Sequence, residues 1–103
     1  MPTYATLPRF TTDLHHLTPK QRHRFRRVVQ TAFVHDLRAG HGFRPGLRVK
    51  RVQCARSGVY ELTWSMGTGP AGRATWQYGT PVHPGEQHII WRRIGTHDIL
   101  TGP

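Results

Sequence analysis

Residues 58–78 read GVYELTWSMGTGPAGRATWQY, and this stretch decides the fold. Two runs rich in aromatic and β-branched residues, 59–64 and 73–78, flank a glycine- and proline-rich connection, which is typical of a β-hairpin. Successive residues on a strand point to opposite faces, so each run has one apolar and one polar row. The apolar rows are Tyr60, Leu62 and Trp64 in the first strand and Ala74, Trp76 and Tyr78 in the second. We expect them to face the core.

The opposite rows of the same two strands are polar. Their members are Glu61 and Thr63 in the first strand and Arg73, Thr75 and Gln77 in the second. A sheet that packs on one side commonly leaves its polar face in water. We therefore expect this face to be open to solvent or to a ligand.

Three tryptophans, Trp64, Trp76 and Trp91, lie one on each of the last three predicted strands. Aromatic side chains can serve as stacking platforms for bases. Aromatic cross-strand pairs also commonly stabilise sheets, and we favour this structural interpretation.

Two further strands are predicted on either side of the hairpin, at residues 47–53 and 88–94. Both runs are short, contain β-branched or aromatic residues, and are bounded by glycine and proline clusters. The connections are short enough for hairpins, so a mainly antiparallel meander is the simplest arrangement.

The N-terminal part carries the signals of a short strand and two helices. Residues 4–7 can form a strand that Pro8 ends, and Thr11 can cap a short first helix. Residues 18–21, TPKQ, combine a capping residue, a proline at the first helical position and a glutamine three residues after the cap. Apolar residues then recur with helical period up to Gly40, which can end the second helix.

These elements predict an α+β fold in a single domain spanning residues 1–103, because a chain of this length buries one core. We expect the short N-terminal strand and the two helices to pack on a mainly antiparallel sheet of four to five strands. The expected core residues are Phe25, Val29, Phe33, Leu62, Trp76 and Ile89.

The charge of the chain points to a polyanionic partner. Fifteen Lys and Arg residues against five Asp and Glu give a formal net charge of +10, and all but Lys20 and Lys50 of the basic residues are arginines. The planar guanidinium matches phosphate oxygens better than an ammonium does, which favours nucleic acid, above all RNA. The alternative is a charged arginine coat with no specific partner.

Cys54 is the only cysteine, so no disulfide within the chain and no cysteine pair for zinc can form. The first ten residues lack a basic start followed by an apolar run, and no stretch has the ~20 apolar residues of a membrane span. We therefore expect a cytoplasmic protein without a membrane partner.

Several local motifs, in this order, resemble the RelE/ParE superfamily of toxins from bacterial type II toxin-antitoxin pairs. The matching segments are 46–52 (GLRVKRV), 58–62 (GVYEL), 72–78 (GRATWQY), 89–91 (IIW) and 95–98 (GTHD). The resemblance spans nearly the whole chain. It implies a RelE/ParE-like domain in which Arg73 and His97 match functional positions of the ribonuclease members.

For function, the resemblance implies a cofactor-free and metal-free endoribonuclease that cuts messenger RNA on the ribosome. It also implies a cognate antitoxin protein whose acidic segment covers the basic face. Glu61 and Thr63 stand where some members carry lysines, and the aromatic residue often found after the terminal basic residue is absent. Two alternatives stay open, namely a non-enzymatic inhibitor of the gyrase-binding ParE type and a plain nucleic-acid-binding domain.

Metal-free RNA cleavage needs a base for the 2′-hydroxyl proton, a cation for the crowded phosphate and an acid for the leaving 5′ oxygen. Glu61, Arg73 and His97 could fill these roles in that order. For Glu61 and Arg73 the alternative is an ordinary cross-strand ion pair. His97 could be incidental, since the chain has eight histidines.

Other basic residues could grip the RNA backbone without sequence preference. The candidates are Arg22, Arg26, Arg27, Arg48, Lys50, Arg51, Arg92 and Arg93. For the first three, a solvated helix face is the alternative. No metal site is predicted, because adjacent His15 and His16 point apart on a helix and His83 and His88 lack a third ligand.

Overall fold

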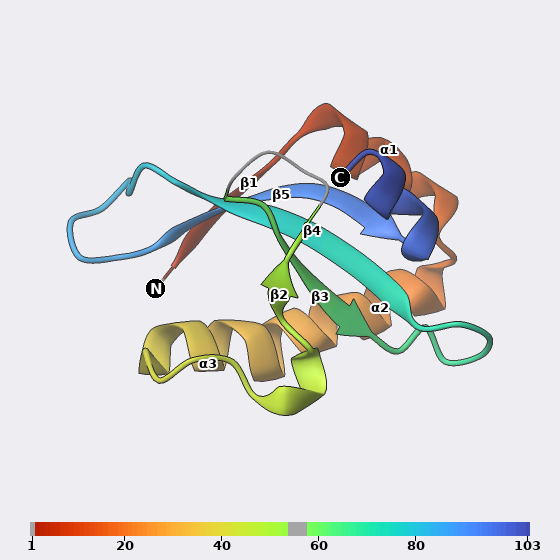
Figure 1. The fold of residues 1–103 in the computed structure, drawn as a ribbon, viewed down its shortest axis with the longest axis horizontal. Coiled ribbons are helices and arrows are strands. Elements are labelled where there is room, and N and C mark those ends of the chain that lie inside the picture. Colours follow the sequence, from red (N-terminus) through yellow and green to blue (C-terminus); the bar gives the residue numbers. More distant parts are fainter. Residues whose placement is uncertain (1, 54–57) are drawn as a thin grey trace.

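The fold is a five-stranded sheet with helices packed on one face (Figure 1). A computed structural model describes residues 2–53 and 58–103, so Cys54 lies outside the described residues. The helices are α1 (Pro8–His16), α2 (Pro19–Val28) and α3 (Val34–Ala39), the last two joined by a π-helical turn, Val29–Phe33. The strands are β1 (Thr3–Thr6), β2 (Lys50–Arg51), β3 (Tyr60–Trp64), β4 (Gly72–Gly79) and β5 (His88–Gly95). A 3₁₀ helix, His97–Thr101, follows β5.

The strand order is β1-β5-β4-β3-β2, with β1 parallel to β5 and every other pair antiparallel. The predicted α+β class and the mainly antiparallel sheet are therefore confirmed. None of the described helices is long and apolar enough to cross a membrane.

The second helix begins as its sequence predicts. The Thr18 backbone N–H donates to the Gln21 side chain at 2.9 Å, and the Gln21 backbone N–H donates to the Thr18 hydroxyl at 3.1 Å. This capping box satisfies two N–H groups that a helix start leaves unpaired. Gly40 ends α3 in the left-handed conformation, with φ of 74°, which glycine adopts without steric cost.

Two predicted elements are wrong in their bounds. The first helix starts at Pro8, not after Thr11, because a proline at the first helical position has no N–H to lose. The predicted strand 47–53 is reduced to β2, since Pro45–Leu47 forms a 3₁₀ turn and Arg48 adopts a left-handed φ of 49°. A residue in that conformation interrupts an extended strand.

The predicted core lies between the helices and the sheet. Phe25, Phe33, Leu62, Trp76 and Ile89 are buried there, and Val29 is partly buried against them. All three tryptophans are at least 95% buried, which supports their structural interpretation. Phe33 contacts the rings of Phe43, Trp76 and Trp91, with centroids about 5 Å apart.

The second face of the sheet is less open than its polar residues suggest. Glu61 and Thr75 are 2% and 0% exposed, so the expectation of a solvent-facing row is wrong for both. The end of the chain covers part of this face, because the Thr75 hydroxyl donates to the Pro103 carbonyl at 3.1 Å. Buried Ile99 in the 3₁₀ helix lies against Gly95 of β5. A polar row can thus be enclosed by a segment distant in sequence.

Candidate functional site

A cavity of about 440 Å³ lies between β2 and the C-terminal 3₁₀ helix. Its lining residues are Lys50, Arg51, Val52, Gln53, Glu61, His97, Asp98, Leu100 and Thr101. The cavity brings together two residues predicted to act in catalysis, Glu61 from β3 and His97 from the 3₁₀ helix. Antiparallel pairing places β2 beside β3, and the turn after β5 carries the chain end back to the same face.

The Glu61 carboxylate is the buried charged group of this cavity. Its side chain is 3% exposed, and its Oε1 atom lies 3.7 Å from Lys50 Nζ and 3.8 Å from Arg73 Nε. These distances allow Coulomb attraction but are too long for hydrogen bonds. Glu61 Oε1 has no hydrogen-bond partner among the described residues. A buried charge in this state is costly for the fold, which makes it a candidate for function.

Arg73 lies beside Glu61 on the neighbouring strand, as strand alternation predicts. It pairs with Thr63 on β3 and with Gly95 on β5, and its side chain is 20% exposed. Its Nη1 atom donates to the Gly72 carbonyl at 3.4 Å, whereas Nε has no hydrogen-bond partner within the described part of the chain. The buried Nε donor of the guanidinium is therefore unused.

His97 is exposed at the start of the 3₁₀ helix and lines the cavity. Thr96 precedes it as the capping residue, and its hydroxyl accepts a hydrogen bond from the Asp98 backbone N–H at 3.4 Å. This cap positions the turn that carries His97. Asp98 also lines the cavity, although it was not among the predicted site residues. The signal of this turn is Thr96 followed two residues later by an aspartate.

Three of the predicted RNA-binding arginines are engaged within the protein. Arg22 donates through Nη1 to the carbonyls of Leu14 and Leu17, at 3.1 and 2.6 Å, and so satisfies the end of α1. Arg92 donates to the Gln77 side chain and, at 3.1 Å, to the Pro103 carbonyl. These two side chains hold structural elements together.

Arg93 forms a two-bond ion pair with Asp13 of α1. Its Nε and Nη2 atoms lie 2.6 and 3.1 Å from the two carboxylate oxygens, and Nη1 donates to the Gly102 carbonyl at 3.0 Å. The Ile94 backbone N–H also donates to Asp13, at 3.1 Å. Asp13 therefore joins α1 to β5, and Arg93 takes part in that junction.

The other predicted RNA-binding residues are exposed and fall into two places. Arg26 and Arg27 lie in the last turn of α2. Arg48, Lys50 and Arg51 lie at or next to β2, beside the cavity. Cations around the cavity thus come mainly from the edge strand of the sheet.

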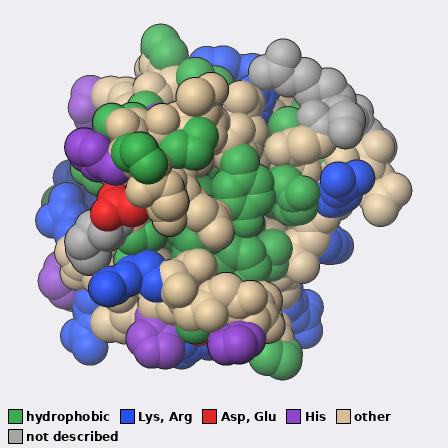
Figure 2. All heavy atoms as spheres, turned by 90° about the vertical axis from the view of Figure 1, so that its left-hand side faces the viewer, with side chains coloured by type: hydrophobic (Ala, Val, Ile, Leu, Met, Phe, Trp, Pro, Cys, Tyr) green, Lys and Arg blue, Asp and Glu red, His purple; other side chains and the backbone are tan. Residues whose placement is uncertain are grey.

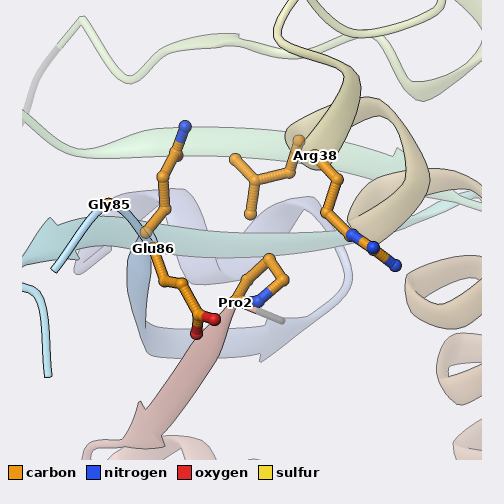
Figure 3. A pocket seen from close by; sticks show the side chains of 6 residues that line it. Pro2, Arg38, Gly85 and Glu86 are labelled. Carbon is orange, nitrogen blue, oxygen red and sulfur yellow. The ribbon is translucent and has the colours of Figure 1, made fainter. Parts of the chain in front are cut away.

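A smaller cavity of about 220 Å³ lies elsewhere, and Figure 3 shows it from close by. Its lining residues are Pro2, Leu37, Arg38, Gly85, Glu86 and Gln87. None of them was predicted as a site residue. Within residues 2–53 and 58–103, no group of three His, Cys, Asp or Glu side chains could hold a metal ion.

No family model, curated protein or solved structure matches this chain. The resemblance to RelE/ParE toxins thus remains a prediction from local motifs, and the functional argument below starts from the geometry of the cavity.

Proposed function

We propose that the protein is an endoribonuclease that cleaves RNA without a metal ion, in the cavity between β2 and the C-terminal 3₁₀ helix. One observation carries the proposal. The buried Glu61 carboxylate, with Oε1 unbonded, lies between Lys50 and Arg73 in a cavity that His97 also lines. An anion-binding pair of cations next to a base and a histidine is the set of groups that this chemistry needs.

In the proposed reaction, Glu61 takes the proton of a ribose 2′-hydroxyl and the 2′ oxygen attacks the adjacent phosphorus. The bond from phosphorus to the 5′ oxygen breaks, and protonated His97 donates its proton to that leaving oxygen. The products are a 2′,3′-cyclic phosphate and a 5′-hydroxyl. Proton exchange with water returns Glu61 and His97 to their starting forms.

Arg73 and Lys50 stabilise the charge that develops on the phosphate. Both cations lie within 4 Å of Glu61 Oε1, so their charges act on a phosphate next to the base, Lys50 from the cavity lining and Arg73 from outside it. Charge-assisted hydrogen bonds from guanidinium and ammonium groups to phosphate oxygens are short and strong. Because Arg73 is mostly buried, its charge acts where water screens it least.

The biological role that we attach to this chemistry is that of a toxin which cuts messenger RNA on the ribosome. The net charge of +10 and the motif resemblance support it. A cognate antitoxin would neutralise the protein by placing an acidic segment over the cations of the cavity.

The direct test uses an oligonucleotide with one ribose in an otherwise 2′-deoxy strand, with and without ribosomes. We expect cleavage only after that ribose, with a 2′,3′-cyclic phosphate on the product, because the 2′-hydroxyl is the nucleophile. The fully 2′-deoxy strand should bind and stay intact. Arg73→Ala should cleave at least ~100-fold more slowly, with Arg73→Lys retaining part of the rate, while thermal melts verify folding.

His97→Ala tests the acid, and His15→Ala is its matched control, since both histidines are exposed and His15 lies on α1. We expect a loss of cleavage for the first variant only. In bacteria, production of the protein alone should arrest growth and yield messenger fragments. Growth arrest with intact messengers and inhibited gyrase would contradict the proposal.

A further inference from the structure

Three exposed or partly exposed tyrosines follow one another on the helix-facing side of the sheet. Tyr4 of β1 and Tyr78 of β4 are 72% and 43% exposed. Both pair with buried Ile89 of β5, so the two tyrosines lie on the same face of the sheet as Ile89. The partly exposed Tyr60 ring contacts the Tyr78 ring at 5.5 Å between centroids. We call Tyr4, Tyr60 and Tyr78 the tyrosine row.

Figure 2 shows that hydrophobic side chains gather on the side of the molecule where the β4–β5 hairpin and α3 end, with Lys and Arg side chains beside them. Contiguous exposed apolar patches with polar neighbours mark interaction surfaces, whereas scattered exposed apolar residues do not. A partner that combines flat apolar groups with negative charge would complement the tyrosine row and the cations beside it.

The row ends at a cation. The Arg51 guanidinium carbon lies 5.7 Å from the centre of the Tyr60 ring, and Arg51 pairs with Tyr60 across β2 and β3. Lys50, the preceding residue, pairs instead with Glu61, and both Lys50 and Arg51 line the catalytic cavity. Because neighbouring side chains on a strand point to opposite faces, the Lys50 side chain lies with Glu61 and the Arg51 side chain with Tyr60.

We propose that the tyrosine row binds a single-stranded RNA segment, stacking its bases, and that the RNA backbone passes round β2 from this row to the cavity. The proposal rests on the proposed function for the identity of the polymer. Aromatic faces stack on any base, and arginine adds cation–π and phosphate contacts. Lys50 and Arg51 offer the phosphates a cation on both faces of the edge.

Charge complementarity favours this occupant. Of the five acidic residues, Asp13 and Asp36 are already paired with Arg93 and Arg44. Near β2, Lys50 lies 3.7 Å from Glu61, and the exposed Arg48 and Arg51 keep most of their attraction for a polyanion. Burial raises the pKa of Tyr78, so its phenol stays neutral at cellular pH and does not repel phosphates.

The rings of Tyr60 and Tyr78 are also held in place before any ligand arrives. Tyr60 stacks on buried Trp76 at 5.7 Å between centroids, and Tyr78 meets Tyr60 edge to face. A platform that is ordered in the free protein loses little side-chain entropy on binding.

The test measures binding of a labelled, fully 2′-deoxy 20-mer, which cannot be cleaved at a 2′-hydroxyl. Tyr4→Leu and Tyr78→Leu should each weaken binding by about fivefold or more, the lower end for one stacked base. Tyr4→Phe and Tyr78→Phe keep the ring and should bind as the wild type does. Tyr4→Leu alone decides the matter if Tyr78→Leu does not fold, because Tyr4 is mostly exposed.

An abasic 20-mer with the same phosphates separates stacking from charge. It should bind the wild type more weakly, and Tyr4→Leu should then cause no further loss. Leucine variants that bind the 20-mer like the wild type would overturn the proposal. The proposal would also be overturned if the leucine variants lost affinity only for a peptide of alternating Glu and Leu, because the row would then bind a protein partner.

The binding assay is independent of catalysis. If the wild type bound the 20-mer through the row but cut no RNA, the ribonuclease proposal would fail and the row would stand as a nucleic-acid site. If the wild type cut RNA while the leucine variants bound the 20-mer normally, the proposal for the tyrosine row would fail and the ribonuclease proposal would stand.

Discussion

Glu61 Oε1 and Arg73 Nε lie 3.8 Å apart inside the sheet, and neither atom makes a hydrogen bond with any described residue. An ion pair enclosed in this way keeps its desolvation cost without the hydrogen bonds that would offset it. A phosphate entering the cavity would meet Lys50, which lines it, whereas Arg73, which is not among the lining residues, would act through its charge. The Glu61–Arg73 pair thus contributes little to stability, and its cation is available to attract an anion.

Replacing Glu61 by glutamine should affect both stability and catalysis. The amide has nearly the same shape but no charge, so the mostly buried Arg73 loses its counter-charge and we expect the free energy of unfolding to fall. If Glu61 is the base, cleavage should fall by about 10²-fold or more. The measurements are denaturant melts and initial cleavage rates.

Asp98→Asn is the matched control, because Asp98 lines the same cavity but is exposed. Its cleavage rate should stay within a few-fold of the wild type. Equal losses for both variants would point to a general charge effect in the cavity.

The basic residues of α2 should divide into a structural and a binding group. Arg26→Gln with Arg27→Gln should weaken RNA binding and reduce its salt dependence, because both side chains are exposed. Arg22→Gln should instead lower the free energy of unfolding by about 1–3 kcal/mol, since carbonyls at the end of α1 lose their donor. Salt titrations of RNA affinity and denaturant melts distinguish the two. Unchanged RNA affinity in the double variant would mean that Arg26 and Arg27 form a solvated face of α2 without a role in binding.

Gly72→Ala should destabilise the protein by overpacking. A Cβ atom at Gly72 would lie 2.6 and 2.7 Å from two atoms of the buried Trp64 ring, which has little room to move. The expected cost is about 1–3 kcal/mol. Gly46→Ala is the control, because nothing lies within 4 Å of its Cβ position. Similar denaturation midpoints for the two variants would contradict this packing.

Phe33→Ala should cost about 3–5 kcal/mol, the range for deleting a buried aromatic side chain. Phe33 is 1% exposed and contacts three other rings. Val82→Ala, at an exposed apolar position, should change the free energy of unfolding by less than about 0.5 kcal/mol. A loss below about 1 kcal/mol for Phe33→Ala would mean that the core relaxes into the space.

The Asp36–Arg44 ion pair should make the stability of the fold depend on pH in the acid range. Hydrogen bonds from Arg44, at 2.8 and 2.9 Å from the side chain and 2.9 Å from the backbone, hold the pKa of Asp36 well below its ordinary value. A pKa lowered by folding stabilises the native state above the unfolded pKa, about 4, and this contribution is lost progressively as the pH falls below it. Asp36→Asn should therefore flatten the acid side of a plot of melting temperature against pH. An unchanged acid side would show that the pair contributes nothing to stability.

Much of the local structure could be predicted from residue patterns. The capping box at Thr18, the glycine end at Gly40 and the alternation in β3 and β4 all depend on neighbours within a few positions. The same alternation put Glu61 and Arg73 on one face. Steric and hydrogen-bonding rules act at this range, so a single sequence carries them.

The sequence by itself thus determined the fold class, the core face of the hairpin and the net charge of +10. Only the tertiary structure decided that Arg22 and Arg93 hold α1 in place, that Thr75 lies under the chain end, and that His97 shares a cavity with Glu61. These outcomes depend on contacts between segments far apart in the chain. Whether a charged or polar side chain meets solvent or another segment is set by how the helices and the C-terminal turn pack on the sheet, and local periodicity contains no record of that packing.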